Sequence, residues 1–231
     1  MMSLVSQPYT CNYCNKGFMQ EKTLFVHVCE QKRRALARTE KHVILGFDTF
    51  QQFYKIAQPN SKQDKTYEDF CKSSYYNAFV KFGSFVSNVN PLYPERFIAY
   101  VVRSGVKLDH WCRDELYDEY VFDLIRKETA ETALQRSIGT MMSWADDHNA
   151  QWNHYFLYVS LSRACYDVRD GKISPWLLLN CTSGKDMLKK FNDEQLMAVS
   201  AVMDIPFWLN KFKKKPADVE LVREVVRESH I

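Results

Sequence analysis

YTCNYCNKGFMQEKTLFVHVCE, residues 9–30, is the stretch that decides the fold of the amino-terminal part of this chain. Cys11 and Cys14 are separated by two residues, and His27 is followed two positions later by Cys29. A cysteine pair with this spacing forms a knuckle that directs both sulfur atoms at one metal ion. The sequence therefore predicts a metal site, in which the last two candidate ligands are unusually close together.

The segment between the cysteine pair and the histidine supplies a miniature core. Phe18 and Leu24 are its apolar residues, and the turn at residues 15–17 contains Gly17, which suits a positive φ angle. So small a module cannot bury enough apolar surface to fold alone. We therefore expect metal binding to contribute most of its folding free energy.

The order and spacing of these residues resemble, position by position, the zinc finger whose ligands are two cysteines and two histidines. The resemblance covers residues 9–30 and implies a small ββα-type fold around one Zn²⁺ ion. The matching positions are an aromatic residue, two cysteines, a phenylalanine, a leucine and a histidine: Tyr9, Cys11, Cys14, Phe18, Leu24 and His27.

The chain departs from this family at the fourth ligand. The usual finger has a second histidine about three to five residues after the first, but residues 31–33 are Gln, Lys and Arg, and Cys29 is the nearby candidate. The predicted ligands form a CCHC variant of the finger: Cys11, Cys14, His27 and Cys29. Four protein ligands leave no open position on the metal, so the predicted zinc is structural.

The short spacing of the last two ligands also constrains the finger helix. Residues two apart on an α-helix are separated by about 200° around its axis. His27 and Cys29 therefore cannot both face one ion while an ideal helix runs through them. We expect the helix to tighten or end near Val28.

The resemblance implies base contacts from four positions of the finger helix, which here are Gln20, Lys22, Thr23 and Val26. The side chain of Val26 cannot hydrogen-bond to a base, and one finger reads only about three base pairs, too few for sequence specificity. Single fingers also bind proteins. A protein partner is therefore the competing interpretation.

Positive charge is concentrated at the start of the chain. Residues 1–42 hold seven Lys or Arg and three Asp or Glu, whereas the other 189 residues hold 24 and 25. The connector, residues 31–42, is a helix-compatible basic run that can contact phosphates without reading sequence. A solvated linker helix is the alternative interpretation of this run.

A second basic segment, NKFKKKP at residues 210–216, follows Trp208 and contains Phe212. Aromatic side chains interleaved with lysines are typical of nucleic-acid surfaces, and a solvated loop between helices is the alternative. The predicted nucleic-acid contacts in the whole chain are Gln20, Lys22, Thr23, Lys32, Arg33, Arg34, Arg38, Lys211, Lys213 and Lys214.

From about residue 43 onward the apolar periodicity predicts helices. Segment 170–180 fits either a brief strand or the first turn of a buried helix, and residues 207–215 lie between the last two helices. The expected helices fall within residues 47–57, 66–89, 90–108, 109–128, 129–147, 150–168, 192–203 and 216–229. The predicted fold is mainly α, with a finger at residues 1–30, the connector at 31–42 and an all-α domain at 43–231.

One polar cluster outside the finger has the composition of a metal site. Asp146, Asp147, His148 and His154 could bind a divalent ion. Adjacent residues point in different directions on a helix, and capping and turn chemistry is the favoured interpretation of such a cluster at a helix end. No catalytic sequence motif occurs elsewhere, so we expect no enzymatic activity.

Composition indicates a folded protein of a reducing compartment. Hydrophobic residues make up 46% of the chain, which argues against disorder. Three of the seven cysteines lie in the finger, and the other four are scattered among hydrophobic neighbours, which predicts a metal site plus buried thiols. No apolar run reaches the about 18 residues needed to cross a bilayer, so we expect a soluble, intracellular protein.

These observations predict a nucleic-acid-binding accessory protein with DNA or RNA as its partner. Compact one-finger proteins of this kind resemble accessory factors that large tailed phages encode for replication, recombination or transcription. The alternative is an adaptor whose finger or helical body binds another protein. A third possibility is a metal-dependent enzyme that uses Asp146, Asp147, His148 and His154.

Overall fold

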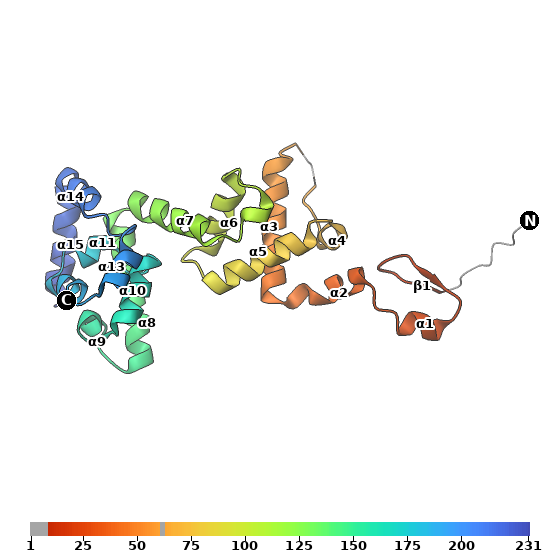
Figure 1. Cartoon of the computed structure of the whole chain (residues 1–231), viewed down its shortest axis with the longest axis horizontal. Coiled ribbons are helices and arrows are strands. Elements are labelled where there is room, and N and C mark those ends of the chain that lie inside the picture. Colours follow the sequence, from red (N-terminus) through yellow and green to blue (C-terminus); the bar gives the residue numbers. More distant parts are fainter. Residues whose placement is uncertain (1–8, 61–62) are drawn as a thin grey trace, which may run out of the picture. The chain divides into compact units, whose positions relative to one another are not determined.

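The computed structural model describes residues 9–60 and 63–231. This part of the chain is mainly α-helical, and its strands form a single antiparallel pair (Figure 1). The chain divides into two compact units, Met1–Arg113 and Asp114–Ile231, a boundary that falls within the predicted helical domain of residues 43–231. The prediction of a mainly α fold is confirmed.

The first unit begins with two very short strands and a short helix. Strand β1 (Tyr9–Thr10) pairs antiparallel with β2 (Gly17–Phe18), which places Tyr9 opposite Phe18. Helix α1 (Glu21–Phe25) follows after two residues. These elements position the predicted metal ligands.

Seven further helical segments follow α1 among the described residues of the first unit. A capping box of Thr66 and Asp69 starts α4, and Pro94 occupies the first turn of α6, as their sequence patterns predicted. The segments are α2 (Glu30–Leu36), α3 (Lys41–Ala57), α4 (Tyr67–Lys72), α5 (Tyr76–Val89), α6 (Pro94–Arg103) and two 3₁₀ turns, η1 (Ala37–Thr39) and η2 (Leu108–His110).

The core of the first unit is built on the crossing of α3 and α5, which Figure 1 shows in contact. The helices approach so closely that a Cβ atom added to Gly83 would lie 2.1 Å from the backbone oxygen of His42 and 2.7 Å from the nitrogen of Gly46. Aromatic rings fill the space around this crossing. Phe79 and Trp111, for example, are almost fully buried, with ring centroids 6.0 Å apart.

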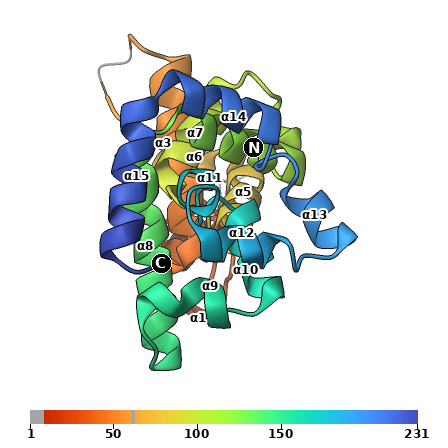
Figure 2. The same cartoon turned by 90° about the vertical axis from the view of Figure 1, so that its left-hand side faces the viewer.

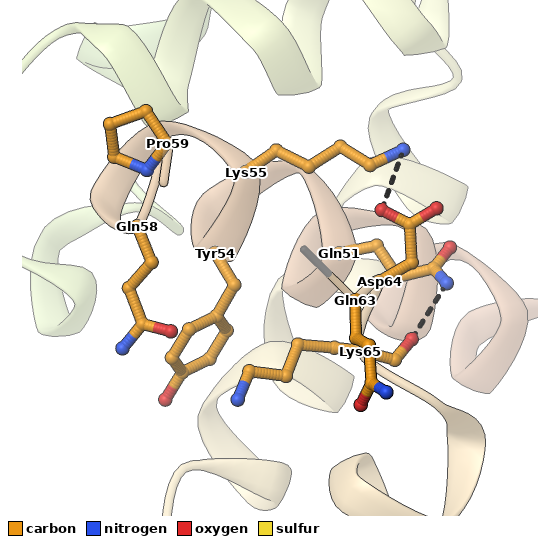
Figure 3. A pocket seen from close by; sticks show the side chains of 8 residues that line it. All are labelled: Gln51, Tyr54, Lys55, Gln58, Pro59, Gln63, Asp64 and Lys65. Carbon is orange, nitrogen blue, oxygen red and sulfur yellow. Dashed lines mark hydrogen bonds and ion pairs between the residues drawn. The ribbon is translucent and has the colours of Figure 1, made fainter. Parts of the chain in front are cut away.

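A small polar pocket lies where α3 ends and the chain returns toward α4 (Figure 3). The side-chain amide of Gln51 donates to the backbone oxygen of Lys65 over 2.9 Å, and Lys55 pairs with Asp64 over 3.6 Å. The ammonium of Lys65 lies 5.0 Å from the centroid of the Tyr54 ring. These contacts hold the returning chain against α3.

The second unit consists of helical segments joined by turns and short loops. In Figure 2 the long helix α15 runs beside α8. The helical segments are α7 (Asp114–Lys127), α8 (Ala130–His148), η3 (Trp152–His154), α9 (Tyr155–Tyr158), α10 (Leu161–Arg169), α11 (Pro175–Leu178), α12 (Thr182–Leu188), α13 (Asp193–Val199), α14 (Ile205–Lys214) and α15 (Pro216–Glu228).

Three segments of the second unit differ from expectation or resolve an open alternative. The helix expected over residues 150–168 is broken, because the side chain of Ser160 accepts a hydrogen bond from Arg163 N and so starts α10 as a new helix. Segment 170–180 contains the buried helical turn α11 instead of a strand. The basic segment within residues 207–215 belongs to helix α14 instead of a loop.

A buried ion pair ties together separate segments of the second unit. The guanidinium of Arg136 forms two bonds to the carboxylate of Glu128, and the two side chains are only 6% and 3% exposed. Nε of Arg136 also donates to Gly171 O over 2.7 Å, and the hydroxyl of Ser174 donates to Glu128 over 2.8 Å. Because both charges are hydrogen-bonded, their burial is tolerated.

No helix in residues 9–60 or 63–231 is both long enough and apolar enough to span a membrane.

Candidate metal centre

The four predicted ligands converge on one point. Their donor atoms, in Cys11, Cys14, His27 and Cys29, all lie within 4.8 Å of one another. Sγ of Cys11 is 3.9 Å from Sγ of Cys29, and Sγ of Cys14 is 3.3 Å from Nε2 of His27. Zinc bonds of about 2.0–2.3 Å place tetrahedral ligands about 3.5–3.8 Å apart, so these distances fit one ion.

The cysteine knuckle is closed by backbone hydrogen bonds. Cys11 N donates to Lys16 O and Asn15 N donates to Cys11 O, each over 2.9 Å. The positive φ angle of this turn, 57°, falls on Asn15. Gly17, where we had expected it, instead pairs with Thr10 in the strands. Asparagine adopts this conformation more readily than most residues, so it can take the place of glycine.

Helix α1 ends early enough for both later candidate ligands to reach one ion. Helix α1 ends at Phe25, and His27 N donates to Leu24 O over 3.1 Å in a final tight turn. The chain from His27 to Cys29 is not helical, in agreement with the expected helix end near Val28. The ring of His27 packs on Phe18 with centroids 4.8 Å apart, which fixes its orientation.

Cys29 has a second structural task. Its sulfur accepts a hydrogen bond from Lys32 N over 3.4 Å and so caps the start of α2. The ammonium of Lys32 reaches back to His27 O over 3.4 Å. Cys29, the fourth candidate ligand, and the first turn of the basic helix α2 are therefore held together.

The surroundings of the first two sulfurs differ. The backbone N–H groups of Cys14 and Tyr13 lower the pKa of the Cys11 thiol. At Cys14 the N–H of Lys16 acts in the same direction, but loss of hydration and the neighbouring thiols of Cys11 and Cys29 outweigh it and raise the pKa. A bound cation would remove the repulsion between the thiolates, so the donor set suits a metal that displaces thiol protons.

The second polar cluster does not form a comparable site. In the described parts of the chain, metal-ligating side chains converge in a group of three or more only around Cys11. Nδ1 of His148 lies 2.7 Å from Trp144 O and its ring stacks on Trp144, while His154 packs against Tyr158. The histidines near Asp146 and Asp147 are thus engaged in helix-end and aromatic contacts.

Most of the predicted nucleic-acid contacts are exposed. The side chains of Gln20, Lys22 and Thr23 surround the start of α1, and Lys32 is half-buried beside the metal ligands. Exposed cations further along are Arg33, Arg38, Lys213 and Lys214.

Arg34 is committed to the fold. Its Nη1 donates to Cys71 O over 2.9 Å and to Ser73 O over 3.1 Å, at the end of α4. Its guanidinium carbon lies 4.4 Å from the centroid of the Tyr76 ring, and another nitrogen pairs with Glu30. Arg34 therefore anchors α2 to α4.

Lys211 is also held inside its unit. Its ammonium donates to Arg126 O over 2.8 Å and to Glu128 O over 3.3 Å, at the end of α7, and lies 4.9 Å from the Trp208 ring. Loss of hydration lowers the pKa of this lysine. Its contacts stabilise the second unit. Of the three lysines predicted here as nucleic-acid contacts, Lys213 and Lys214 are exposed.

A cleft beside the metal centre was not anticipated from sequence. It has a volume of about 360 Å³ and lies between the knuckle, α2 and α4. The sequence contains an indication of this cleft, because residues 31, 35 and 38 are spaced so that they lie on one face of a helix. The lining residues are Asn12, Tyr13, Gln31, Ala35, Arg38, Tyr67, Glu68, Cys71 and Lys72.

Comparison with protein-family models, with curated protein sequences and with solved structures finds no match to this chain.

Proposed function

We propose that residues 9–30 form a ββα-type zinc finger with CCHC ligands, and that this finger holds the basic helix α2 for binding to nucleic-acid phosphates. The observation that carries the proposal is the position of Cys29, whose sulfur lies among the four converging donors and also caps α2. Metal binding then fixes where the basic helix begins. All four positions on the metal are filled by protein, which makes its role structural.

Charge supports a polyanionic partner. Three thiolates on one Zn²⁺ would lower the net charge of residues 1–42 by one unit, and the segment would remain cationic. Lys22, Arg33 and Arg38 are exposed on the finger and on the segment after it. Contacts of this type supply affinity without reading sequence.

Salt dependence tests the proposal. We expect the full chain to bind DNA or RNA with an affinity that falls as salt rises from about 50 to 200 mM. Arg33→Ala should weaken binding to all sequences alike and reduce the slope of log affinity against log salt by about one. Fluorescence anisotropy with labelled oligonucleotides measures both effects.

The matched control is Arg223→Ala, which removes an exposed arginine from α15 in the second unit. This variant should bind as the unchanged protein does. Equal losses in the two variants would indicate that net charge alone drives binding. An absence of binding at low salt would refute the proposal.

Exposed apolar side chains favour a second candidate, a protein-binding adaptor. Phe25 is 83% exposed, and Met19, Val26 and Val28 are also largely exposed on the finger. Such side chains contribute little to phosphate binding and suit a protein interface. An adaptor would keep its partner at high salt and lose it on Phe25→Ser, whereas the nucleic-acid complex would dissociate as salt rises.

A further inference from the structure

The cleft beside the metal centre has walls suited to a flat aromatic ligand. Tyr67 forms one wall, and its ring is held in place because its hydroxyl donates to Arg34 O over 2.6 Å. The guanidinium of Arg38 lies over this ring, 5.1 Å from its centroid. The ring of Tyr13, which is 42% exposed, lies on the knuckle side.

One face of α2 and η1 forms the base of the cleft. Gln31, Ala35 and Arg38 follow each other at helical spacing, so they share this face. Ala35 is the small residue in the middle and leaves the space open. The amide groups of Asn12 and Gln31 offer donors and acceptors to the edge of a ligand.

Charge at the rim does not repel a polyanion. The one carboxylate of the lining, Glu68, is paired with Lys72 over 2.6 Å. Arg38 adds a positive charge next to the basic helix α2. A volume of about 360 Å³ is at the lower end of the range for ligand sites, which suits a single base instead of a peptide segment.

We propose that this cleft holds one unpaired nucleobase of a single-stranded nucleic acid, stacked against Tyr13 and Arg38. The inference rests on the proposed nucleic-acid binding and adds the class of ligand. Bases of a duplex are stacked inside it and cannot enter such a cleft without being extruded. Unpaired bases stack readily on aromatic rings and guanidinium planes, whatever their identity.

The experiment compares single strands with a duplex. Anisotropy of labelled oligo(dT), oligo(U) and a duplex, each of about 12 nucleotides, gives the affinities at low salt. The unchanged protein should prefer single strands. Tyr13→Ala should weaken single-strand binding about fivefold or more and leave duplex binding unchanged, while Tyr13→Phe should retain the affinity, since its ring still stacks.

Ala35→Leu is a second variant that leaves the knuckle intact. Its larger side chain fills the base of the cleft, so the same selective loss of single-strand binding is expected. Elemental analysis of each protein reports whether the metal is retained. If Tyr13→Ala loses its metal, Ala35→Leu shows whether the cleft binds the base. Oligo(dT) and oligo(U) separate a DNA ligand from an RNA ligand, because only RNA offers the 2′-hydroxyl.

Phe25→Ala is the matched control, because it removes an exposed ring of the finger outside the cleft. Unchanged single-strand binding in this variant supports the cleft. Unchanged binding in Ala35→Leu, or a loss confined to Phe25→Ala, overturns it while phosphate binding by α2 stands. If the unchanged protein binds none of the three oligonucleotides, the proposed function fails as well.

Discussion

At the residue scale, Arg33 and Arg34 are neighbours with different surroundings. Arg33 is exposed, whereas the side chain of Arg34 is 13% exposed and donates to two carbonyls at the end of α4. We expect Arg34→Ala to lower the free energy of unfolding of the first unit by about 1.5–3 kcal/mol, the range for buried hydrogen bonds of charged groups. Hydrogen exchange of α4 and α5 amides under increasing denaturant measures the loss.

Arg33→Ala provides the comparison, because this surface substitution should change the free energy of unfolding by no more than about 0.5 kcal/mol. Arg34→Lys should recover little, since an ammonium cannot reproduce the planar, forked donor set or its stacking on Tyr76. Equal stability of the Arg34→Ala and Arg33→Ala proteins would contradict the anchoring role.

The candidate metal site was predictable from the sequence, whereas the structural roles of Arg34 and Lys211 were not. The convergence of Cys11, Cys14, His27 and Cys29 was predictable because tetrahedral coordination imposes a local spacing on candidate ligands. The partners of Arg34 lie 37 and 39 residues away, and those of Lys211 lie more than 80 residues away. A local charge pattern contains no information about such contacts, so both residues looked like surface cations.

At the element scale, the crossing of α3 and α5 depends on glycine. An added Cβ at Gly83 would meet backbone atoms of His42 and Gly46, which cannot rotate away as a side chain can. We expect Gly83→Ala to lower the free energy of unfolding by about 3 kcal/mol, the upper end for overpacking. Accelerated hydrogen exchange in α3 and α5 would report the separation of the two helices.

Gly139→Ala is the opposite test of the same substitution. Gly139 lies within α8, and nothing is within 4 Å of the added Cβ. Alanine should therefore stabilise this helix by about 0.5–1 kcal/mol through the lower backbone entropy of its unfolded state. If Gly139→Ala also lowered the free energy of unfolding, the expected gain from backbone entropy at this open position would be contradicted.

Element boundaries were predictable where a local cap decides them. Thr66 with Asp69, and Pro94, start helices as their patterns indicate. The break at Ser160 was not predicted, because its hydroxyl caps α10 inside an otherwise continuous apolar pattern. The helical state of the lysine-rich part of α14 was not predicted either; there Trp208 is fully buried and the ammonium of Lys211 donates to Arg126 O in α7. Tertiary contacts decided that segment.

At the scale of the whole molecule, the amino-acid composition does not mark the boundary between the two units. The boundary falls between Arg113 and Asp114, where the chain has no run of glycine, proline or serine. Such runs are the usual mark of a linker. Each unit instead has its own aromatic core, with Trp111 buried in the first and Trp176 and Trp208 buried in the second.

Metal removal should therefore act on one unit alone. We expect a chelator to abolish amide protection in residues 9–30 and in the first turn of α2, because the finger has too little core to fold without metal and Cys29 caps that turn. Amides of α7 to α15 should keep their protection in the same hydrogen-exchange experiment.

Zn²⁺ should restore the finger and Mg²⁺ should not, because thiolates favour the softer ion. Cys29→Ala should behave as the chelated protein, whereas Cys112→Ala, which lies outside the cluster, should retain its metal. Uniform loss of protection in both units, or none, would contradict a metal centre confined to the finger.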